Sequence, residues 1–148
     1  MFRHTVYSDP VIINAPVERV WHVLTDLEHY PDWNPFTFQV LGELTPGRPV
    51  ELHVRMPGKS DTVSVETVLC VDQWEKLSWG LTMLTPLLLQ ARRDQQLQAL
   101  SASQCRYQTW DAFSGLLTPI VIALYGNSMQ QGFNAVALAL KQHCEQPV

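Results

Sequence analysis

The chain has the length of a single domain, and its composition is poor in charge. Of its 148 residues, 46% are hydrophobic and 16% are charged, with a formal net charge of -4. A typical soluble domain is roughly 25% charged, which suggests apolar surface that lines an interior space. The net charge, with no cluster of cations beyond Arg92 and Arg93, argues against a surface that binds phosphates. We therefore expect residues 1–148 to form one domain with no nucleic-acid partner.

The spacing of the cysteines and histidines and the length of the apolar segments argue against a disulfide-rich protein, a metalloprotein and a membrane-spanning protein. The three cysteines, Cys70, Cys105 and Cys144, are odd in number and lack a CxxC spacing, so neither a disulfide framework nor a zinc site is expected and a reducing cytoplasm fits best. The five histidines lack HxH and HExxH spacings, and we expect no metal and no cofactor. The apolar run 120–125 is far shorter than the roughly 20 residues of a membrane-spanning helix, so stable membrane insertion is not expected.

The first third of the chain predicts a short strand followed by a helix and a bend. Residues 8–13 are typical of a strand, and Pro16 with Glu18 marks the start of a helix. Its apolar residues recur at helical spacing: Val17, Val20, Trp21 and Leu24. We expect this helix to end near Glu28, because two prolines follow in residues 29–36. A bent second helix or a tight turn should come next.

The middle of the chain alternates with a period of two, which predicts half-buried antiparallel strands. The apolar positions are Leu52, Val54 and Met56, then Val63, Val65, Leu69 and Val71, then Leu77, Trp79 and Leu81. Turn signals at 45–47, 57–59 and 72–73 separate these strands at hairpin spacing. Two further strands are expected at 88–100 and 104–115.

A long amphipathic helix is predicted from about Pro119 to Cys144. Its apolar stripe contains Tyr125, Met129, Phe133, Val136, Leu140 and Cys144. The predicted fold class is α+β, a curved antiparallel sheet of six to seven strands around this helix, with two short helices after the first strand. One helix cannot fill the concave face of so large a sheet, so we expect a cavity.

Three segments of the chain resemble one superfamily. They are residues 15–21 (APVERVW), 30–36 (YPDWNPF) and 111–117 (DAFSGLL). In this order and spacing they resemble the SRPBCC superfamily, which includes START lipid-transfer domains and the birch-pollen-allergen type, and the polyketide cyclase/dehydrase-like branch is the most similar. The resemblance implies a helix-grip fold with a deep pocket between the sheet and the last helix. It implies no particular reaction, because members include carriers, receptors, cyclases and chaperone activators.

The sequence departs from its relatives at two positions of the expected pocket. Relatives often have Glu at the position of Asp111, so the acid is kept and is one methylene shorter. Relatives commonly have the sequence Gly-Glu-His where this chain has Ala91, Arg92 and Arg93. Arg93 therefore stands at the position of the histidine, and any role of that histidine cannot be transferred to this chain.

The last two strands predict a polar cluster. A short turn near 101–102 would place Arg93 opposite Asp111, Gln95 opposite Thr109 and Leu97 opposite Tyr107. If Tyr107 and Phe113 face the cavity, Thr109 and Asp111 do so too. We hypothesise that Arg93 and Asp111 form a hydrogen-bonded pair that orients the polar end of a ligand. The alternative is an ion pair on the outer face of the sheet.

The remaining candidate positions are apolar and fit either a pocket wall or plain core. Trp33 and Phe36 would form one mouth of the pocket or plug the open end of the sheet, and Trp110 should face outward. The full set of expected ligand contacts is Trp33, Phe36, Val54, Met56, Val65, Trp79, Arg93, Tyr107, Thr109, Asp111, Phe113, Met129 and Phe133.

Three functions are compatible with these patterns. The leading one is binding of a small lipid-like or polyketide-like molecule without catalysis. The second is a cyclase or dehydratase in which pocket shape positions the substrate and Arg93 and Asp111 move protons. The third is an adaptor or co-chaperone-like module that binds a partner protein. The sequence also leaves open whether the chain forms a homodimer.

Overall fold

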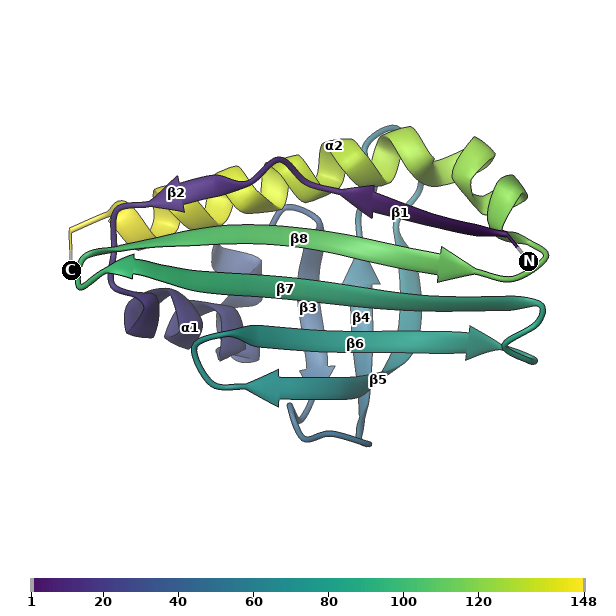
Figure 1. The fold of residues 1–148 in the computed structure, drawn as a ribbon, viewed down its shortest axis with the longest axis horizontal. Helices are drawn as coiled ribbons and strands as arrows, with labels where there is room; N and C mark the ends of the chain where they lie inside the picture. The colour runs from purple at the N-terminus through teal and green to yellow at the C-terminus, as the bar shows by residue number, and fades with distance from the viewer. Residues whose placement is uncertain (1, 148) are drawn as a thin grey trace.

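The computed structural model describes residues 2–147, which form eight strands, two α-helices and one 3₁₀ helix (Figure 1). In chain order they are β1 Arg3–Tyr7, β2 Val11–Ile13, α1 Val17–Thr25, η1 Leu27–Asp32, β3 Thr37–Gly42, β4 Pro49–Val54, β5 Thr62–Asp72, β6 Lys76–Met83, β7 Leu89–Ser101, β8 Gln104–Ser114 and α2 Thr118–Glu145.

The strands form one antiparallel sheet in the order β1-β8-β7-β6-β5-β4-β3, with β2 also paired to β8. The sheet bends, so that β3 and β4 lie behind β6 to β8 in Figure 1 and run across them, while α2 follows β1, β2 and β8 lengthwise. This arrangement confirms the predicted α+β helix-grip class.

The N-terminal segment adds one strand to the six or seven that the sequence predicts. Of the expected strand at 8–13, only residues 11–13 form a strand, β2. It is preceded by β1, which was not predicted; residues 8–10, including Pro10, separate the two, and both pair with β8. Proline has no amide hydrogen for a sheet, so the strand is interrupted there. Ser8 bridges the gap, because its amide donates to the Thr109 carbonyl at 2.8 Å and its hydroxyl accepts from the Thr109 amide at 3.1 Å.

The first helix is shorter than predicted. It ends at Thr25, and the bent second helix is η1, which contains Pro31 in its last turn. Asp26 leaves the helical region, with φ -85° and ψ 79°. The Tyr30 hydroxyl then donates to the Leu24 carbonyl at 2.6 Å, so the folded-back chain caps the end of α1 and the Tyr30 ring is buried.

Strand β5 shows where the predicted alternation was wrong. Val65 was expected to face the cavity, but it is 62% exposed on the outer face. The register shifts between Val68 and Cys70, and a bulge of this kind reverses which parity faces inward. Val71 therefore faces inward after the bulge, whereas Val68 and Glu66 face inward before it. Of the four alternating residues predicted on one face, Val63, Val65 and Leu69 are therefore exposed and Val71 packs against the core.

The register of the last hairpin is as predicted. Arg93 lies opposite Asp111, Gln95 opposite Thr109 and Leu97 opposite Tyr107. The apolar stripe of α2 is also confirmed, since its members are buried except for Tyr125, which is 39% exposed.

Candidate functional site

A cavity of about 350 Å³ lies inside the bend of the sheet, under the first half of α2. It is therefore not completely plugged by aromatic side chains. Its lining consists of Phe36, Thr37, Leu52, Val54, Met56, Thr62, Ser64, Glu66, Trp79, Leu81, Met83, Arg93, Asp111, Phe113, Val121, Tyr125 and Met129. Period-two alternation on β4 to β8 and a period of three to four on α2 bring these residues to one space. Most of the wall is apolar, and the charged groups come from β5, β7 and β8.

Arg93 is buried beside the cavity and is held by groups behind it. Its Nε donates to the Thr109 hydroxyl at 2.7 Å, and that hydroxyl donates in turn to the Asp94 carbonyl at 2.7 Å. The guanidinium carbon lies 4.2 Å from the centre of the Phe133 ring and 5.6 Å from that of Phe36. Such cation–π contacts are strongest when they are desolvated, so this arginine is fixed in place.

Asp111 lines the cavity with a carboxylate oxygen that has no partner. Its Oδ1 is inaccessible to solvent and accepts no hydrogen bond from the described residues. Burial, the negative charge of Glu66 and that of Asp94 together raise the pKa of Asp111 to about 7, against the opposing effect of the positive charge of Arg93. Near neutral pH this side chain is therefore divided between its acid and its carboxylate form.

Glu66 is the second acid of the cavity. Its Oε2 accepts a hydrogen bond from the Ser64 hydroxyl at 3.0 Å. Burial raises the pKa of Glu66, against the opposing effects of the Ser64 hydrogen bond and the charge of Arg93. The two acids therefore share one mostly apolar space and one nearby cation.

The predicted hydrogen-bonded pair of Arg93 and Asp111 does not form. Both side chains line the cavity, as the inward-facing alternative required, but no ion pair or hydrogen bond joins them within residues 2–147. Nε of Arg93 donates instead to the hydroxyl of Thr109, the diagonal neighbour of Arg93 on β8.

The structure brings eight of the predicted ligand contacts into the cavity wall: Phe36, Val54, Met56, Trp79, Arg93, Asp111, Phe113 and Met129. Thr109 and Phe133 lie behind the wall and contact Arg93. Tyr107 is fully buried, where its hydroxyl donates to Gln95 Oε1 at 2.6 Å and burial raises its pKa to about 12.

Trp33 lies away from the cavity and fills another part of the interior. Its ring is 5.2 Å from that of Tyr30 and stacks at 6.4 Å on His143 near the end of α2. Of the two interpretations, mouth of the pocket or plug, Trp33 therefore follows the plug. Phe36 lines the cavity.

Sequence reasoning missed the polar residues that β5 contributes, Glu66 above all. The structure, and no signal in the sequence, reveals this face, because Val68 is fully buried. Positions 64, 66 and 68 share one face of a strand, so a buried Val68 implies that Ser64 and Glu66 face inward as well.

The cavity opens beside the β4–β5 connection. A neighbouring depression shares Met56, Thr62 and Tyr125 with the cavity and adds Lys59 and Ser60. The Lys59 amine lies 5.6 Å from the centre of the Tyr125 ring, so these two side chains border the mouth.

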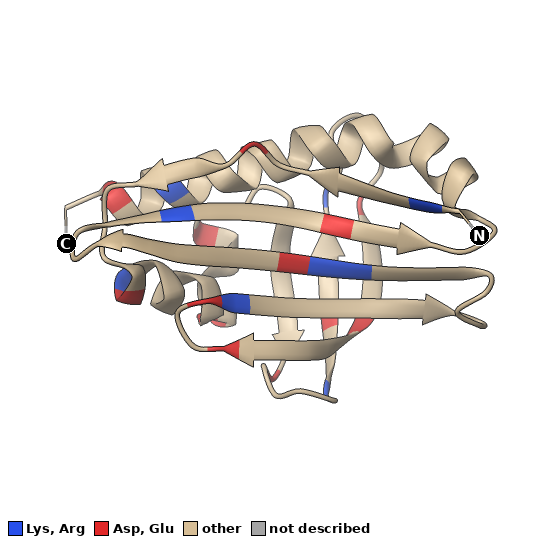
Figure 2. Cartoon of the chain, in the orientation of Figure 1, with Lys and Arg blue, Asp and Glu red and all other residues tan. Residues whose placement is uncertain are grey.

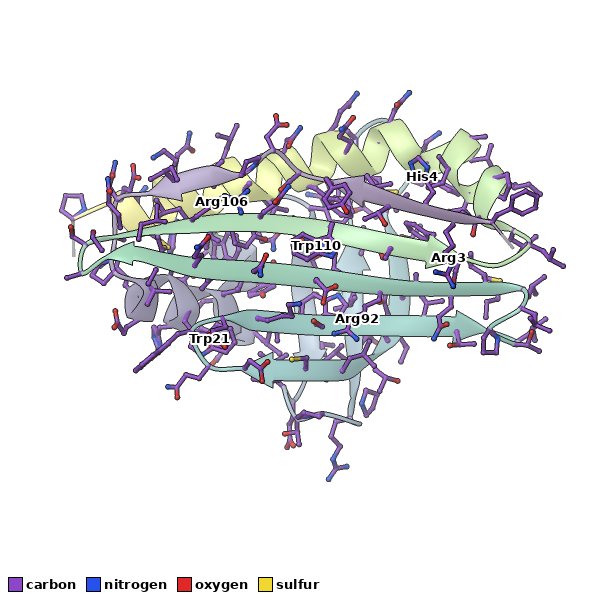
Figure 3. The ribbon with its side chains drawn as sticks, in the orientation of Figure 1. Arg3, His4, Trp21, Arg92, Arg106 and Trp110 are labelled. Carbon is purple, nitrogen blue, oxygen red and sulfur yellow. The ribbon has the colours of Figure 1, made fainter. Side chains whose placement is uncertain are left out.

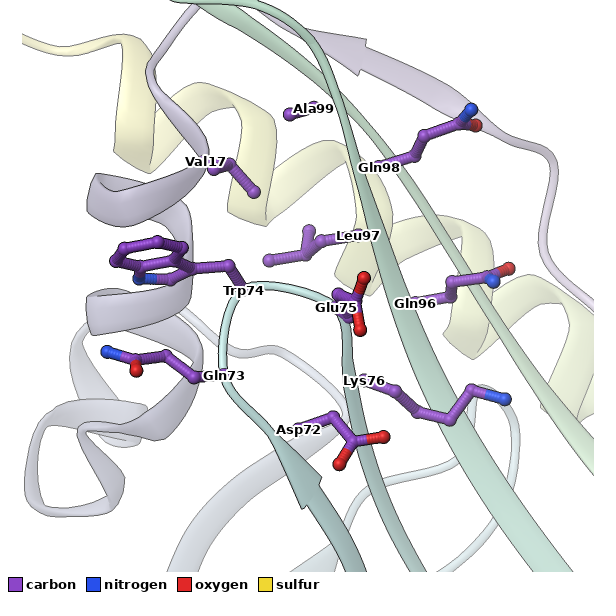
Figure 4. Close-up of a pocket in the computed structure, with 10 residues that line it drawn as sticks. All are labelled: Val17, Asp72, Gln73, Trp74, Glu75, Lys76, Gln96, Leu97, Gln98 and Ala99. Carbon is purple, nitrogen blue, oxygen red and sulfur yellow. The ribbon is translucent and has the colours of Figure 1, made fainter.

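A larger depression of about 820 Å³ lies where the β5–β6 turn approaches α1 and β7 (Figure 4). Figure 4 shows Trp74 at this turn, with Gln73 and Asp72 following the chain beside it. Most residues around it are exposed, and it holds no buried charge or unpaired polar atom. We therefore place the candidate site in the interior cavity.

The outer face of the sheet carries its own polar network, which is separate from the cavity. Asp94 is buried and accepts from Trp110 Nε1 at 3.0 Å, from Arg92 Nε at 3.1 Å and from the Ser78 hydroxyl. Figure 3 shows Trp110 and Arg92 over the centre of the sheet. Trp110 thus faces outward as predicted, and every oxygen of Asp94 has a partner.

Charged residues are few over most of the molecule. Figure 2 shows adjacent acidic and basic positions at the centre of β7, separate ones on β8 and on α1, and others near the turns, while most of α2 carries none. Within residues 2–147 no group of three or more His, Cys, Asp or Glu is placed to hold a metal ion. None of the helices in this range has both the length and the apolar character that crossing a membrane requires.

Solved structures share this fold at low sequence identity. The chain aligns with an aromatase/cyclase, Zhui, from a Streptomyces species at 20% identity and a TM-score of 0.74, covering 97% of this chain and 94% of that one. A START superfamily protein from Mycobacterium smegmatis aligns at 21% identity and a TM-score of 0.70, covering 97% and 98%. A truncated norcoclaurine synthase from Thalictrum flavum aligns at 14% identity and a TM-score of 0.74, covering 99% and 96%.

These likenesses show the fold, and the family follows from the sequence itself. No curated protein matches the chain. Residues 4–137 match the model of the family described as polyketide cyclase / dehydrase and lipid transport. That match spans both strands of the last hairpin and most of α2, which together build the cavity. The chain therefore belongs to the polyketide cyclase / dehydrase and lipid transport family.

Proposed function

We propose that this domain binds one small, mostly apolar molecule in the cavity between the sheet and α2. The observation that carries the proposal is the cavity itself, which keeps about 350 Å³ free although the surrounding side chains are otherwise well buried. Ligand pockets in proteins measure roughly 300–1,000 Å³ and combine apolar walls with a few convergent polar groups. The volume favours a guest of one or two fused rings, or a short acyl chain.

A fluorescent probe tests this proposal. N-phenyl-1-naphthylamine is uncharged at neutral pH, and its emission rises in an apolar environment. We expect saturable binding to the wild-type protein. Met129→Trp should weaken it at least about tenfold, because Met129 is 3% exposed and lines the cavity, and a larger side chain there fills the space.

Two further variants keep the result interpretable. Val121→Phe narrows the cavity from a half-buried position of α2, so it serves if Met129→Trp fails to fold. Leu138→Trp adds the same indole to α2 at a position that is 52% exposed, and it should bind like wild type. Absence of saturable binding, or equal affinity in the filled variants, would contradict the proposal.

The second candidate function is a cyclase or dehydratase. The observation that favours it is the acid Asp111, whose pKa of about 7 suits proton transfer at neutral pH. In that case Asp111→Asn should abolish cyclisation of a poly-β-ketone analogue, followed by its ultraviolet absorbance, and leave binding of the analogue intact. If the wild type shows no turnover of the analogue, and Asp111→Asn only weakens its binding, the result favours the binding function. The adaptor role and the homodimer stay predictions.

A further inference from the structure

The cavity contains one more acid than base. Glu66 and Asp111 are its acidic lining residues, and among the described residues that line it Arg93 is the sole cation. The groups that face Asp111 are therefore Glu66 from β5 and Arg93 from β7, while α2 contributes the neutral Tyr125 at the mouth. Asp94 lies on the opposite face of β7, where its own partners hold it. With both acids ionised, the cavity has a net charge of one negative unit.

Arg93 is not free to neutralise either acid by direct contact. Its Nε is bonded to Thr109, and its guanidinium lies over Phe133. It forms no ion pair with Glu66 or Asp111 in residues 2–147. Moving it toward the carboxyl groups would break these contacts, so its charge acts on them only at a distance.

The carboxyl groups have acceptor capacity that the protein does not fill. Asp111 Oδ1 has no hydrogen-bond partner although it is inaccessible to solvent, and Glu66 has one partner, the Ser64 hydroxyl. Buried polar atoms nearly always have partners, and an exception asks for an explanation. A donor supplied by the guest would satisfy these oxygens.

We propose that the guest is an amphipathic amine, whose protonated nitrogen lies between Asp111 and Glu66 while its apolar body occupies the rest of the cavity. An ammonium group has donors and no acceptor, and its charge balances the surplus acid. A carboxylate guest would instead add a third negative group to an apolar space. This inference rests on the proposed binding function and adds the chemical class of the guest.

Three matched probes test the inference: 2-naphthylmethylamine, 2-naphthylmethanol and 2-naphthoate. They share one ring system and differ in the polar end, and an alkylamine is protonated at about pH 7.5. We expect the amine to bind at least about tenfold more tightly than the alcohol, as charge-assisted hydrogen bonds do, and the carboxylate to bind most weakly. Calorimetry at about pH 6 should also show proton release on binding of the amine, because the ammonium keeps the carboxyl groups ionised.

Variants separate this inference from the cavity itself. Glu66→Gln and Asp111→Asn should each reduce the advantage of the amine over the alcohol, and the double variant should bind both equally. Arg93→Met should increase that advantage, because it removes the competing cation. Met129→Trp should weaken all three probes alike.

The outcomes distinguish the two proposals. Equal affinity of the wild type for the three probes, or preference for the alcohol or the carboxylate, overturns the amine inference and leaves the cavity proposal standing. Failure of all three probes to bind overturns the cavity proposal and the amine inference with it. An amine preference that persists in the double variant also overturns the inference, because the nitrogen then lies elsewhere.

Discussion

Replacing Asp111 by Asn should make the protein's stability less sensitive to pH. The carboxyl of Asp111 has its pKa raised from 3.8 to about 7 by burial, by Glu66 and by Asp94. Between these values the folded state holds a proton that the unfolded state has lost. The stabilisation is therefore complete below about pH 4 and is lost as the pH rises to about 7. Asparagine has nearly the same shape and never ionises.

The size of the stability change follows from the width of the pH range between the unfolded and folded pKa values of Asp111. One pKa unit corresponds to about 1.4 kcal/mol, so the wild type should lose about 3 kcal/mol relative to Asp111→Asn between about pH 5 and about pH 8. Urea unfolding of both proteins at a series of pH values measures this difference. It should grow steadily up to about pH 7 and then level off.

A control variant, Asp61→Asn, removes a carboxyl whose effect on the pH dependence of stability has the opposite sign. Asp61 is an exposed carboxyl whose pKa is lowered by its hydrogen bond and ion pair with Arg55. Its stabilisation is fully present above the unfolded pKa of 3.8 and is lost only as the pH falls below that value. The difference between wild type and Asp61→Asn should therefore be constant between about pH 5 and about pH 8, and should shrink only below about pH 4. A wild-type to Asp111→Asn difference that is the same at both ends of the range would refute the reasoning, because Asp111 would then ionise as easily in the folded state as in the unfolded chain.

Two other predictions concern the same cavity. Glu66→Gln should lower the pKa of Asp111 and Arg93→Met should raise it, because the first removes a repulsive charge and the second an attractive one. An NMR titration that follows the carboxyl carbon of Asp111 measures both pKa values. A change of the pKa in the same direction in both variants would contradict the assignment. Gly132→Ala should lower the free energy of unfolding by up to about 2 kcal/mol, because a Cβ there overlaps the Phe36 ring and the cost of overpacking, about 1–3 kcal/mol, exceeds the gain of about 1 kcal/mol in helix propensity. Urea unfolding checks this, and an unchanged or higher free energy would show that the ring moves away freely.

The register of the last hairpin could be predicted because two strong constraints act on it. Two long strands follow each other closely, so a short turn near residues 101–102 fixes every pair between them at once. The apolar residues Leu97 and Tyr107 then decide which face is buried. These constraints placed Arg93 and Asp111 opposite each other, as the structure shows. Whether the two face inward or outward was left open, and the structure has them on the inner face.

Register does not determine where long side chains end. Directly opposite residues have their Cβ atoms close together, but an arginine also reaches diagonal neighbours. Thr109 is such a neighbour, and its hydroxyl offers Arg93 an acceptor without a second buried charge. The predicted pair with Asp111 therefore failed at the level of side-chain contacts, although the strand register was correct.

The face of β5 could not be predicted because a bulge has no reliable signature in a single sequence. Val63 and Val65 are apolar and alternate with Ser64 and Glu66, which favours burial of the valines. The structure exposes the valines and turns Glu66 toward the cavity. The missed carboxyl doubles the number of acids in the site, so the polar character of the cavity was the part that sequence reasoning could not supply.

The same aromatic packing that stabilises the interior also determines where the cavity ends. Phe36 and Phe133 meet edge to face at 5.2 Å, and the bare backbone of Gly132 lets Phe36 approach α2 closely. Arg93 lies over Phe133, so the aromatic pair and the cation together fill the interior beyond Met129. Toward the start of α2 no comparable aromatic pair exists in the lining, and the space stays open as far as the mouth at Tyr125. In the proposed binding mode a guest would pass along an apolar wall and meet the carboxyl groups next to this aromatic block, which favours burial of its polar end.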